Sequence, residues 1–340
     1  MEAFEVNRSF ITLKKTIQLS SLLLFTLLLV SIFSISVGTV AIPLSQILNF
    51  LVGGKIAEEY STILFELRLP RILLAIIVGG GLSVAGVVFQ AILRNPLAEP
   101  FILGVSSGGT LGAVLAISFG LGFSIISVPA SAFLGSLVVI MVVYFVSEKH
   151  GRLDPTTLLL TGIMVGAFFN AMILLVMVIR HQEVRGAFLW LMGNLSSADM
   201  NSFLVVAPVV LIATIIIYFN SRKYNLIATG DETAQSLGVE VEKFKRISYG
   251  LASLITGLVV SLSGIIGFVG LIIPHISRMI FGADHRILIP VSFLLGAILL
   301  VVVDTIARTL ISPAEIPVGT VTAFIGAPIF IWLLKRSQTR

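Results

Sequence analysis

The chain alternates between long apolar segments and short polar or Pro/Gly-rich interruptions along nearly its whole length. A helix needs about 20 apolar residues to cross a bilayer core of about 30 Å, and the recurring apolar segments have that length. Taking the interruptions as boundaries, we predict ten spans, at 17–36, 68–90, 101–119, 126–147, 156–180, 201–219, 246–263, 267–281, 287–308 and 319–335. The pattern therefore predicts an all-α integral membrane protein in which residues 1–340 form a single transmembrane domain.

The longest polar interruption, residues 220–246, is predicted to contain one short helix. Asp231 and Glu232 follow Gly230 and suit a first helical turn, where acidic side chains meet the positive end of the helix dipole. Gly238 suits the C-terminal cap. The segment between these two glycines is therefore expected to form about two turns of helix.

This short helix is expected to present Ala234 and Leu237 on one face, because residues three apart are neighbours on a helix surface. A short amphipathic loop helix is often simply solvated. The alternative is that the helix is a docking surface for another protein. The spacing alone leaves both interpretations open.

The composition supports the membrane assignment. Hydrophobic residues make up 57% of the chain and charged residues 11%, with a mean hydropathy of +1.08, whereas a soluble domain has about 25% charged residues. We attribute the net charge of +5 to basic residues in cytoplasmic loops and not to a nucleic-acid-binding surface. The absence of cysteine excludes disulfides and thiolate metal sites. The apolar run 17–35 is longer than the core of a signal peptide, so we expect it to be a retained first span.

The distribution of Lys and Arg predicts the orientation. With the N-terminus inside, 16 of the 22 basic residues fall on the cytoplasmic side and six on the other. This bias places both termini in the cytoplasm and makes 220–246 the largest cytoplasmic loop. The expected location is the plasma membrane, either a bacterial inner membrane or an archaeal membrane.

Glycine is frequent inside the predicted spans, as in Gly79–Gly81, Gly86 and Gly270. Small residues allow membrane helices to approach closely. The alternative is that some glycines mark breaks where the backbone lines a path. Glu99 and Glu315, each beside prolines and on opposite membrane faces, also suggest an inverted repeat.

Catalytic motifs are missing from the sequence. No Gly-rich loop ends in Gly-Lys-Ser/Thr, no His-Glu-x-x-His or Gly-x-Ser-x-Gly occurs, and His275 and His285 lack a third metal ligand. Asp304 is the one acid well inside a span, and Arg308 is its expected i,i+4 partner. We therefore expect no enzyme activity, no cofactor and no metal site in this chain, and no ion coupling. An ion-coupled secondary carrier remains the alternative; otherwise the energy must come from another protein.

Three arginines, Arg68, Arg71 and Arg308, lie near the predicted outer surface. Arginines at a membrane interface often extend their head groups toward water. Together these three could instead form a positive rim for an acidic partner or an anionic solute.

Motifs along the chain resemble the FecCD-type permease subunits of ABC importers for vitamin B12, haem and ferric siderophores. They cover essentially everything after the first span and occur in the family order: RLPR (68–71), GVVFQ (86–90), NPLAEP (95–100), LGVSSG (103–108), WLMG (190–193), GDETAQSLGV (230–239), GFVGLIIPHISR (267–278) and IPVGTVTAFIGAP (316–328).

The resemblance implies a type II ABC importer permease fold with ten helices per subunit. It implies a second permease copy, two cytosolic ATPase subunits that carry ATP and Mg, and an extracytoplasmic substrate-binding protein. The expected cargo is a ferric siderophore, with haem or vitamin B12 as alternatives, arriving with its metal already chelated.

The resemblance also implies roles for individual residues. Arg68, Arg71 and Arg308 match positions that pair with glutamates of the binding protein. Asp154, Pro155 and Thr156 match the cytoplasmic gate, although Pro155 departs from the small hydroxyl residues typical of that place. The ATPase-coupling helix corresponds to Gly230, Asp231, Glu232, Ala234, Leu237 and Gly238.

Overall fold

A computed structural model describes residues 13–54, 56–120, 127–149, 151–180, 184–197 and 199–338. Within these ranges the chain is almost entirely helical, and the strands form one two-stranded hairpin, β1 (Glu148–Lys149) and β2 (Arg152–Leu153). The predicted all-α class is confirmed. Arg8, Lys55 and Arg340, which contribute to the charge bias, lie outside the described residues.

Each predicted span contains a helix. Seven of the described helices are long and apolar enough to cross a membrane, and they include α1 (Leu13–Ser36), α4 (Leu69–Ile92), α6 (Ser127–Ser147), α7 (Pro155–Ile179), α9 (Met200–Phe219), α12 (Val241–Ser263) and α14 (His285–Thr309). The apolar parts of the other three are shorter: α5 (Val105–Ser118), α13 (Val269–Phe281) and α15 (Val318–Gln338).

The second predicted span is longer than its sequence suggested. α3 (Glu58–Thr62) and the π-helix η1 (Ile63–Arg68) continue directly into α4, giving one helix of 35 residues. Pro70 explains the π-helical turn, because it has no N–H to donate to the preceding turn. Shorter helices occupy the connections: α2 (Leu44–Leu51), η2 (Pro100–Leu103), α8 (Val184–Leu191), α10 (Ser221–Thr229) and α11 (Asp231–Ser236).

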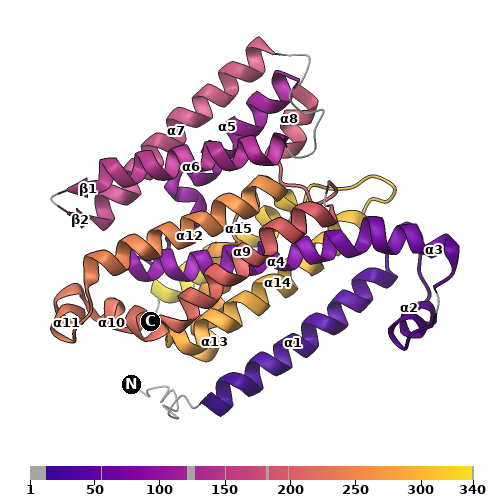
Figure 1. Cartoon of the computed structure of the whole chain (residues 1–340), viewed down its shortest axis with the longest axis horizontal. Helices are drawn as coiled ribbons and strands as arrows, with labels where there is room; N and C mark the ends of the chain where they lie inside the picture. The colour runs from indigo at the N-terminus through magenta and orange to yellow at the C-terminus, as the bar shows by residue number, and fades with distance from the viewer. Residues whose placement is uncertain are drawn as a thin grey trace.

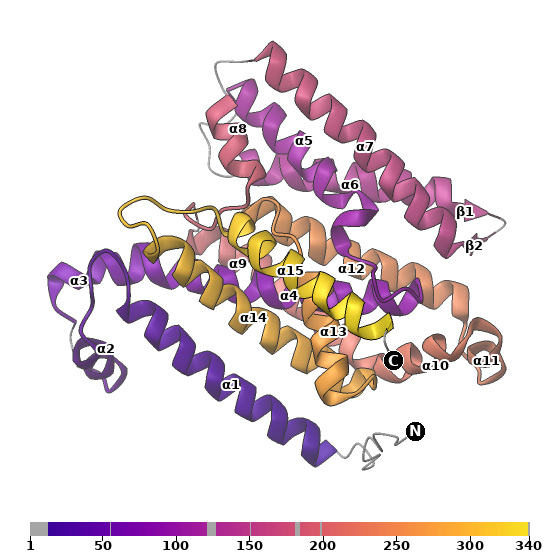
Figure 2. The same cartoon turned by 180° about the vertical axis from the view of Figure 1, so that it is seen from behind.

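α4 runs through the centre of the molecule (Figure 1). It packs against α9, α12, α13 and α14, while α5, α6, α7 and α8 form a second group on one side. α1 packs along α14 on the outer side, and α15 lies on the face seen in Figure 2. α10, α11 and the hairpin lie at one end of the bundle, which we call the α11 end; α2, α3 and α8 lie at the other, the α2 end.

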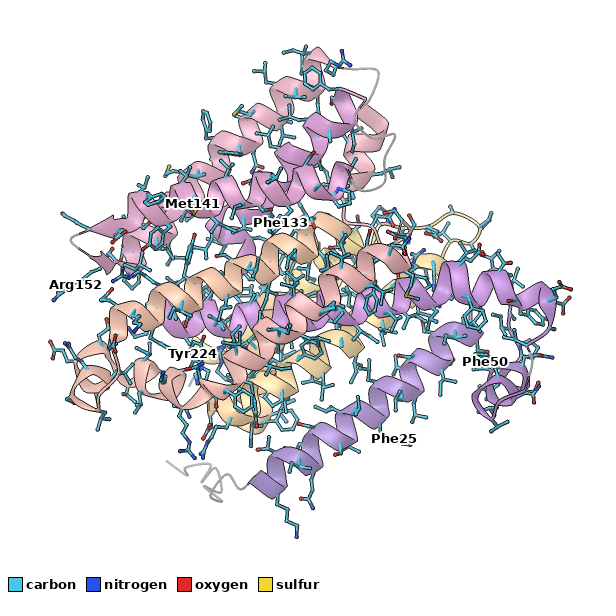
Figure 3. All side chains as sticks on the ribbon, viewed as in Figure 1. Phe25, Phe50, Phe133, Met141, Arg152 and Tyr224 are labelled. Carbon is cyan, nitrogen blue, oxygen red and sulfur yellow. The ribbon has the colours of Figure 1, made fainter. Side chains whose placement is uncertain are left out.

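Burial agrees with a bundle surrounded by lipid. Nearly every residue of α4 is buried. The outer helices instead expose apolar side chains, such as Phe25, which is 59% exposed, and Val205, which is 71% exposed. Figure 3 shows Phe25 pointing away from the bundle. An apolar surface of this kind is stable against acyl chains and unstable in water.

Glycines allow α4 to contact its neighbours backbone to backbone. A Cβ atom on Gly86 would lie 1.9 Å from the carbonyl oxygen of Gly270 in α13, and one on Gly79 would lie 2.2 Å from that of Gly296 in α14. No side chain fits at these distances. The close-packing interpretation of the glycines holds at these positions.

The connection between α12 and α13 contains two residues with positive φ; the interpretation that such breaks line a path stays a prediction. Gly264 ends α12 with a φ of +66°, and Phe268 precedes α13 with a φ of +69°. The Phe268 amide donates to the carboxylate of Glu99, 2.6 Å away in the loop after α4. A carboxylate at this place stabilises the positive N-terminal end of α13.

Replacing Gly86 with alanine should destabilise the protein, because the neighbour that must move is backbone and not a flexible side chain. We expect the free energy of unfolding to fall by about 1–3 kcal/mol, measured as a lower thermal midpoint of the detergent-solubilised protein. Gly250→Ala is the matched control, since a Cβ atom there meets nothing within 4 Å. A Gly86→Ala midpoint at or above the wild-type value would contradict the packing argument.

Candidate functional site

At the α2 end, Arg71 joins three elements through ion pairs. Its Nε atom donates to Asp304 of α14 at 2.8 Å. Its terminal nitrogen donates to both carboxylate oxygens of Glu315, at 2.9 and 3.1 Å. Arg71 and Asp304 are buried, whereas the side chain of Glu315 is 43% exposed. Arg71 therefore already has two carboxylate partners within its own chain.

Arg68 and Arg308 hold the C-terminal end of α1. Arg68 donates to the carbonyl oxygens of Ile35 and Val40, and Arg308 donates to those of Ser34 and Val37. The last carbonyls of a helix lack partners within the helix and carry partial negative charge. Two guanidinium groups satisfy them here, which explains why both arginines are buried so close to the polar end of the bundle.

The prediction that Arg308 is the partner of Asp304 is only partly correct. Arg308 does lie within ion-pair distance, with its Nε atom 3.7 Å from Asp304 Oδ2. The hydrogen-bonded partner, however, is Arg71. The sequence did not indicate this pair, because the two residues are 233 positions apart and on different helices.

The three arginines, with Glu315, line a cavity of about 200 Å³ at the α2 end. They carry three positive charges against the two negative charges of Asp304 and Glu315. The structure thus brings Arg68, Arg71 and Arg308 together as the sequence suggested. It places them in a largely self-satisfied network, and Glu315 is its most accessible carboxylate.

At the α11 end, the polar segment 220–246 holds more structure than was predicted. α10 (Ser221–Thr229) precedes α11, and α12 begins within the segment at Val241. α11 itself lies between Gly230 and Gly238, whose φ angles of +129° and +84° suit glycine. The predicted short helix and its two boundary glycines are confirmed.

The expected shared face of Ala234 and Leu237 is wrong. Ala234 is fully buried, whereas Leu237 is 62% exposed. The reason is that α11 ends at Ser236 and Leu237 is already in its C-cap, with a ψ of 15°, so helical spacing no longer applies. Leu237 is left as an exposed apolar side chain at the tip of this end of the bundle.

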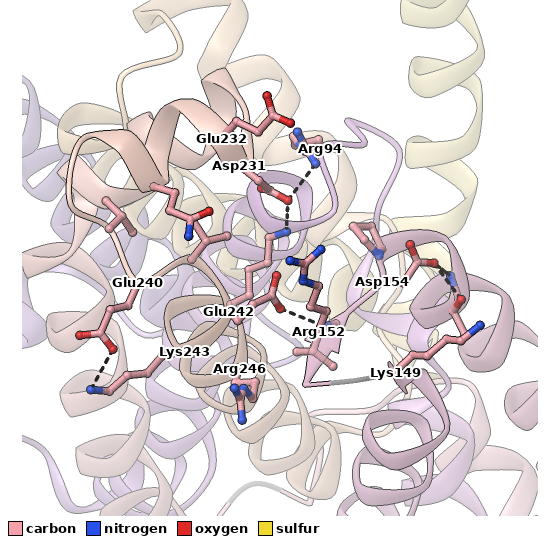
Figure 4. A pocket seen from close by; sticks show the side chains of 17 residues that line it. Arg94, Lys149, Arg152, Asp154, Asp231, Glu232, Glu240, Glu242, Lys243 and Arg246 are labelled. Atoms are coloured by element: carbon pink, nitrogen blue, oxygen red, sulfur yellow. Dashed lines mark hydrogen bonds and ion pairs between the residues drawn. The ribbon is translucent and has the colours of Figure 1, made fainter.

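Asp231 fixes α11 to two other elements. One carboxylate oxygen lies 2.6 Å from Nζ of Lys245 in α12 and 3.3 Å from a guanidinium nitrogen of Arg94, just after α4 (Figure 4). Lys245 is only 3% exposed. A buried ammonium needs a charged partner, so this contact fixes the position of α11. Glu232, next to it, is exposed.

The predicted gate residues begin α7. Asp154 is the N-cap and accepts from both the amide and the hydroxyl of Thr157, at 2.7 and 2.8 Å. The bond from the Thr157 amide, and after it the bond from the hydroxyl, hold the pKa of Asp154 below its ordinary value. The carboxyl group therefore stays ionised. Pro155 occupies the first helical turn, where its missing N–H costs nothing. Thr156 is exposed.

One cavity of about 1290 Å³ joins these groups. Its walls include Asp154 and Pro155 on the α7 side and Asp231 and Glu232 on the α11 side (Figure 4). The structure therefore brings the candidate coupling helix and the candidate gate to a single cavity, although they are distant in sequence. The arginine network lies at the opposite end of the bundle.

A further polar cluster connects α10 to the start of α14, and no sequence pattern indicated it. The side-chain amide of Asn225 donates to Asp284 at 2.9 Å, and its carbonyl oxygen accepts from the amide of His285 at 2.9 Å. Burial raises the pKa of Asp284, but the bonds from Arg286 and Asn225 outweigh it and bring the pKa to about 2. This ionised carboxylate also accepts from the amide of Arg286 at the N-terminus of α14.

Comparison with known proteins identifies the fold. A solved structure of a transporter assigned to the metal-chelate type of ABC transporter, in an inward-facing conformation, shares 34% identity with a TM-score of 0.84, covering 94% of this chain and 99% of that chain. The cobalamin import system permease protein BtuC of Halobacterium salinarum is 41% identical over 84% of this chain and 76% of its own length. The hemin transport system permease protein HmuU of Yersinia pestis is 38% identical over 93% and 95%.

The model of the FecCD transport family matches residues 26–336, which is nearly the whole of the apolar bundle described above. The chain therefore belongs to the FecCD transport family and is the membrane permease component of an ABC transporter.

Proposed function

We propose that this permease carries a metal chelate inward across the plasma membrane, in a complex with a second permease copy, two cytosolic ATPase subunits and an extracytoplasmic binding protein. The observation that carries the proposal is the breadth of the similarity. Relatives named for import of cobalamin, hemin, iron(3+)-hydroxamate and Fe(3+) dicitrate all match over 84% or more of this chain. A ferric siderophore is the favoured cargo, with haem or vitamin B12 as alternatives.

We propose that the α11 end faces the cytoplasm. The basic residues counted on the inner side include Arg94, Arg152 and Lys245, which all line the large cavity at this end. The bias of basic residues toward the cytoplasm and the clustering of the three in one place support the same orientation. Both chain termini are then cytoplasmic.

ATP and Mg are expected to bind the partner ATPases. In this chain α11 supplies the docking surface: Asp231 fixes its N-terminal end, and Leu237 offers an exposed apolar side chain for the partner to bury. Movement of α11 between ATPase states would reach the gate at Asp154–Thr156 across the shared cavity.

The arginine network at the α2 end is the proposed docking site for the binding protein. Because Arg71 is occupied by Glu315, an acidic group on the partner must compete with this internal carboxylate. Glu315 is half-exposed, so it can move away without disturbing the buried pair of Arg71 and Asp304.

Reconstitution tests the proposed function directly. We consider liposomes that contain the permease with its ATPases facing the lumen, and that receive the binding protein from outside. They should take up ferrichrome when ATP is enclosed in the lumen. Parallel assays use haemin, cyanocobalamin and molybdate, the last because a molybdate import permease of Haemophilus influenzae is also 37% identical. Uptake driven by an ion gradient without ATPase subunits would overturn the proposal.

Replacing Leu237 with aspartate should weaken ATPase binding, because the interface would have to bury an unpaired charge. We expect affinity to fall by about tenfold or more, measured by co-purification and by titration of the ATPase onto permease in nanodiscs. Val52→Asp is the matched control: this side chain is also exposed, at 83%, but lies at the α2 end. Normal assembly of Leu237→Asp would refute the docking role.

Replacing Glu315 with glutamine should strengthen binding-protein docking, because Arg71 loses its internal competitor but keeps Asp304. Exposed ion pairs contribute about 0.2–1 kcal/mol, so Kd should fall by about threefold, with the difference shrinking at high salt. Glu66→Gln, an exposed acid at the same end, serves as control. Unchanged or weaker binding in Glu315→Gln would mean that Arg71 does not receive the partner.

A further inference from the structure

The first turn of α12 contacts both the candidate docking helix and the candidate gate. We call residues 241–245 the connecting turn. Glu242 and Lys245 are three positions apart on this turn and so lie near one face of the helix. Lys245 contacts α11 and Glu242 contacts the hairpin before α7.

On the α11 side the contact is buried and charged. Lys245 meets Asp231 at 2.6 Å and is 3% exposed. Backbone bonds add to it, because the amide of Val239 donates to the carbonyl of Ala234 at 3.0 Å. Ala234, Val239 and Val241 are all buried in the main core. α11 and the connecting turn are therefore expected to move as one piece.

On the gate side the contact is to backbone. The carboxylate of Glu242 accepts from the amide of Leu153 at 2.9 Å. Leu153 ends β2, is itself buried, and precedes Asp154, the N-cap of α7. A charge-assisted bond to a backbone amide is stronger than a neutral one. It also holds the main chain itself, so a displacement of α12 is passed to the start of α7.

The cavity separates α11 from the hairpin, so the bond between Glu242 and Leu153 is a link between the two sides. α11 and the hairpin form opposite walls of a space of about 1290 Å³ (Figure 4). The connecting turn also lines this space, through Glu242 and Lys245. The connecting turn contacts both walls, so a movement of one wall can reach the other through its side chains.

We propose that the connecting turn transmits movement of α11 to the start of α7, and that Glu242 is the positioning residue through which the gate follows. This inference rests on the proposed function, and adds to it the mechanical link between ATPase docking and gating. Loss of the Glu242 bond should leave the two sites intact but loosen their coupling.

The test uses the reconstituted permease–ATPase complex and the chelate that the wild-type complex takes up among ferrichrome, haemin and cyanocobalamin. In Glu242→Ala, the amount of chelate taken up per ATP hydrolysed should fall by about tenfold, within the range of measured coupling effects. Glu242→Gln keeps an acceptor oxygen and should retain most of the wild-type ratio. Glu240→Ala is the matched control: it removes an exposed carboxylate nearby, whose partner Lys243 is exposed too.

A ratio in Glu242→Ala equal to that of wild type overturns the inference, as does a parallel loss of uptake and ATP hydrolysis, which indicates a purely structural role. A failure of the wild-type complex to assemble or to transport is a different result, since it counts against the proposed function whatever residue 242 is.

A second measurement needs no ATPase. The natural chain has no cysteine, so spin labels can be placed on Lys149→Cys in the hairpin and Gln235→Cys in α11, both exposed positions. In permease embedded in nanodiscs, the distance distribution between the labels should be narrow in the wild-type and Glu242→Gln backgrounds and broad in Glu242→Ala. Identical distributions in all three would show that Glu242 does not hold the hairpin.

Discussion

The close backbone contact of α4 with its neighbours is the constraint on which the rest of this structure depends. Lipid offers no hydrophobic drive for helices to associate, so the bundle must gain its cohesion from packing. Gly86 against Gly270 and Gly79 against Gly296 bring the backbones together. Dispersion contacts accumulate along such a seam. Because α4 is buried on all sides, the helices that touch it take their positions from it.

A rigid central helix also fixes the distance between two polar sites. α4 begins beside Arg71, which pairs with α14 and the loop after it, and ends just before Arg94, which pairs with α11. Each site gathers charges from elements distant in sequence and forms ion pairs among them within the chain. Charges buried in this way are costly unless paired, so the pairs define the local geometry as well as its chemistry. The two ends can then serve different partners.

The α11 end differs from the rest of the bundle in how it is held. Transmembrane helices meet along extended apolar surfaces, whereas α11 and the hairpin are small elements that border a cavity and add polar bonds to the few core side chains that they bury. The close-packed helices of the bundle resist rearrangement, so a displacement of this small end can be passed on as a unit through the bonds that hold it. This difference suits a transporter in which a partner protein moves α11 and the transmembrane helices then move together.

The sequence by itself determined which apolar segments form helices, the short helix between Gly230 and Gly238, and the family, because hydrophobic length, glycine caps and ordered motifs are local signals. It did not reveal α10 or the helical extension through Glu58–Arg68, since polar and charged residues tolerate both loop and helix. It also did not reveal the exposure of Leu237, because the spacing did not show that α11 ends one residue earlier. The inverted repeat stays a prediction. Only the tertiary structure decided that Arg71 pairs with Asp304 and Glu315, and that Glu242 holds Leu153. Such contacts join residues far apart in the chain, and packing alone decides which of them meet.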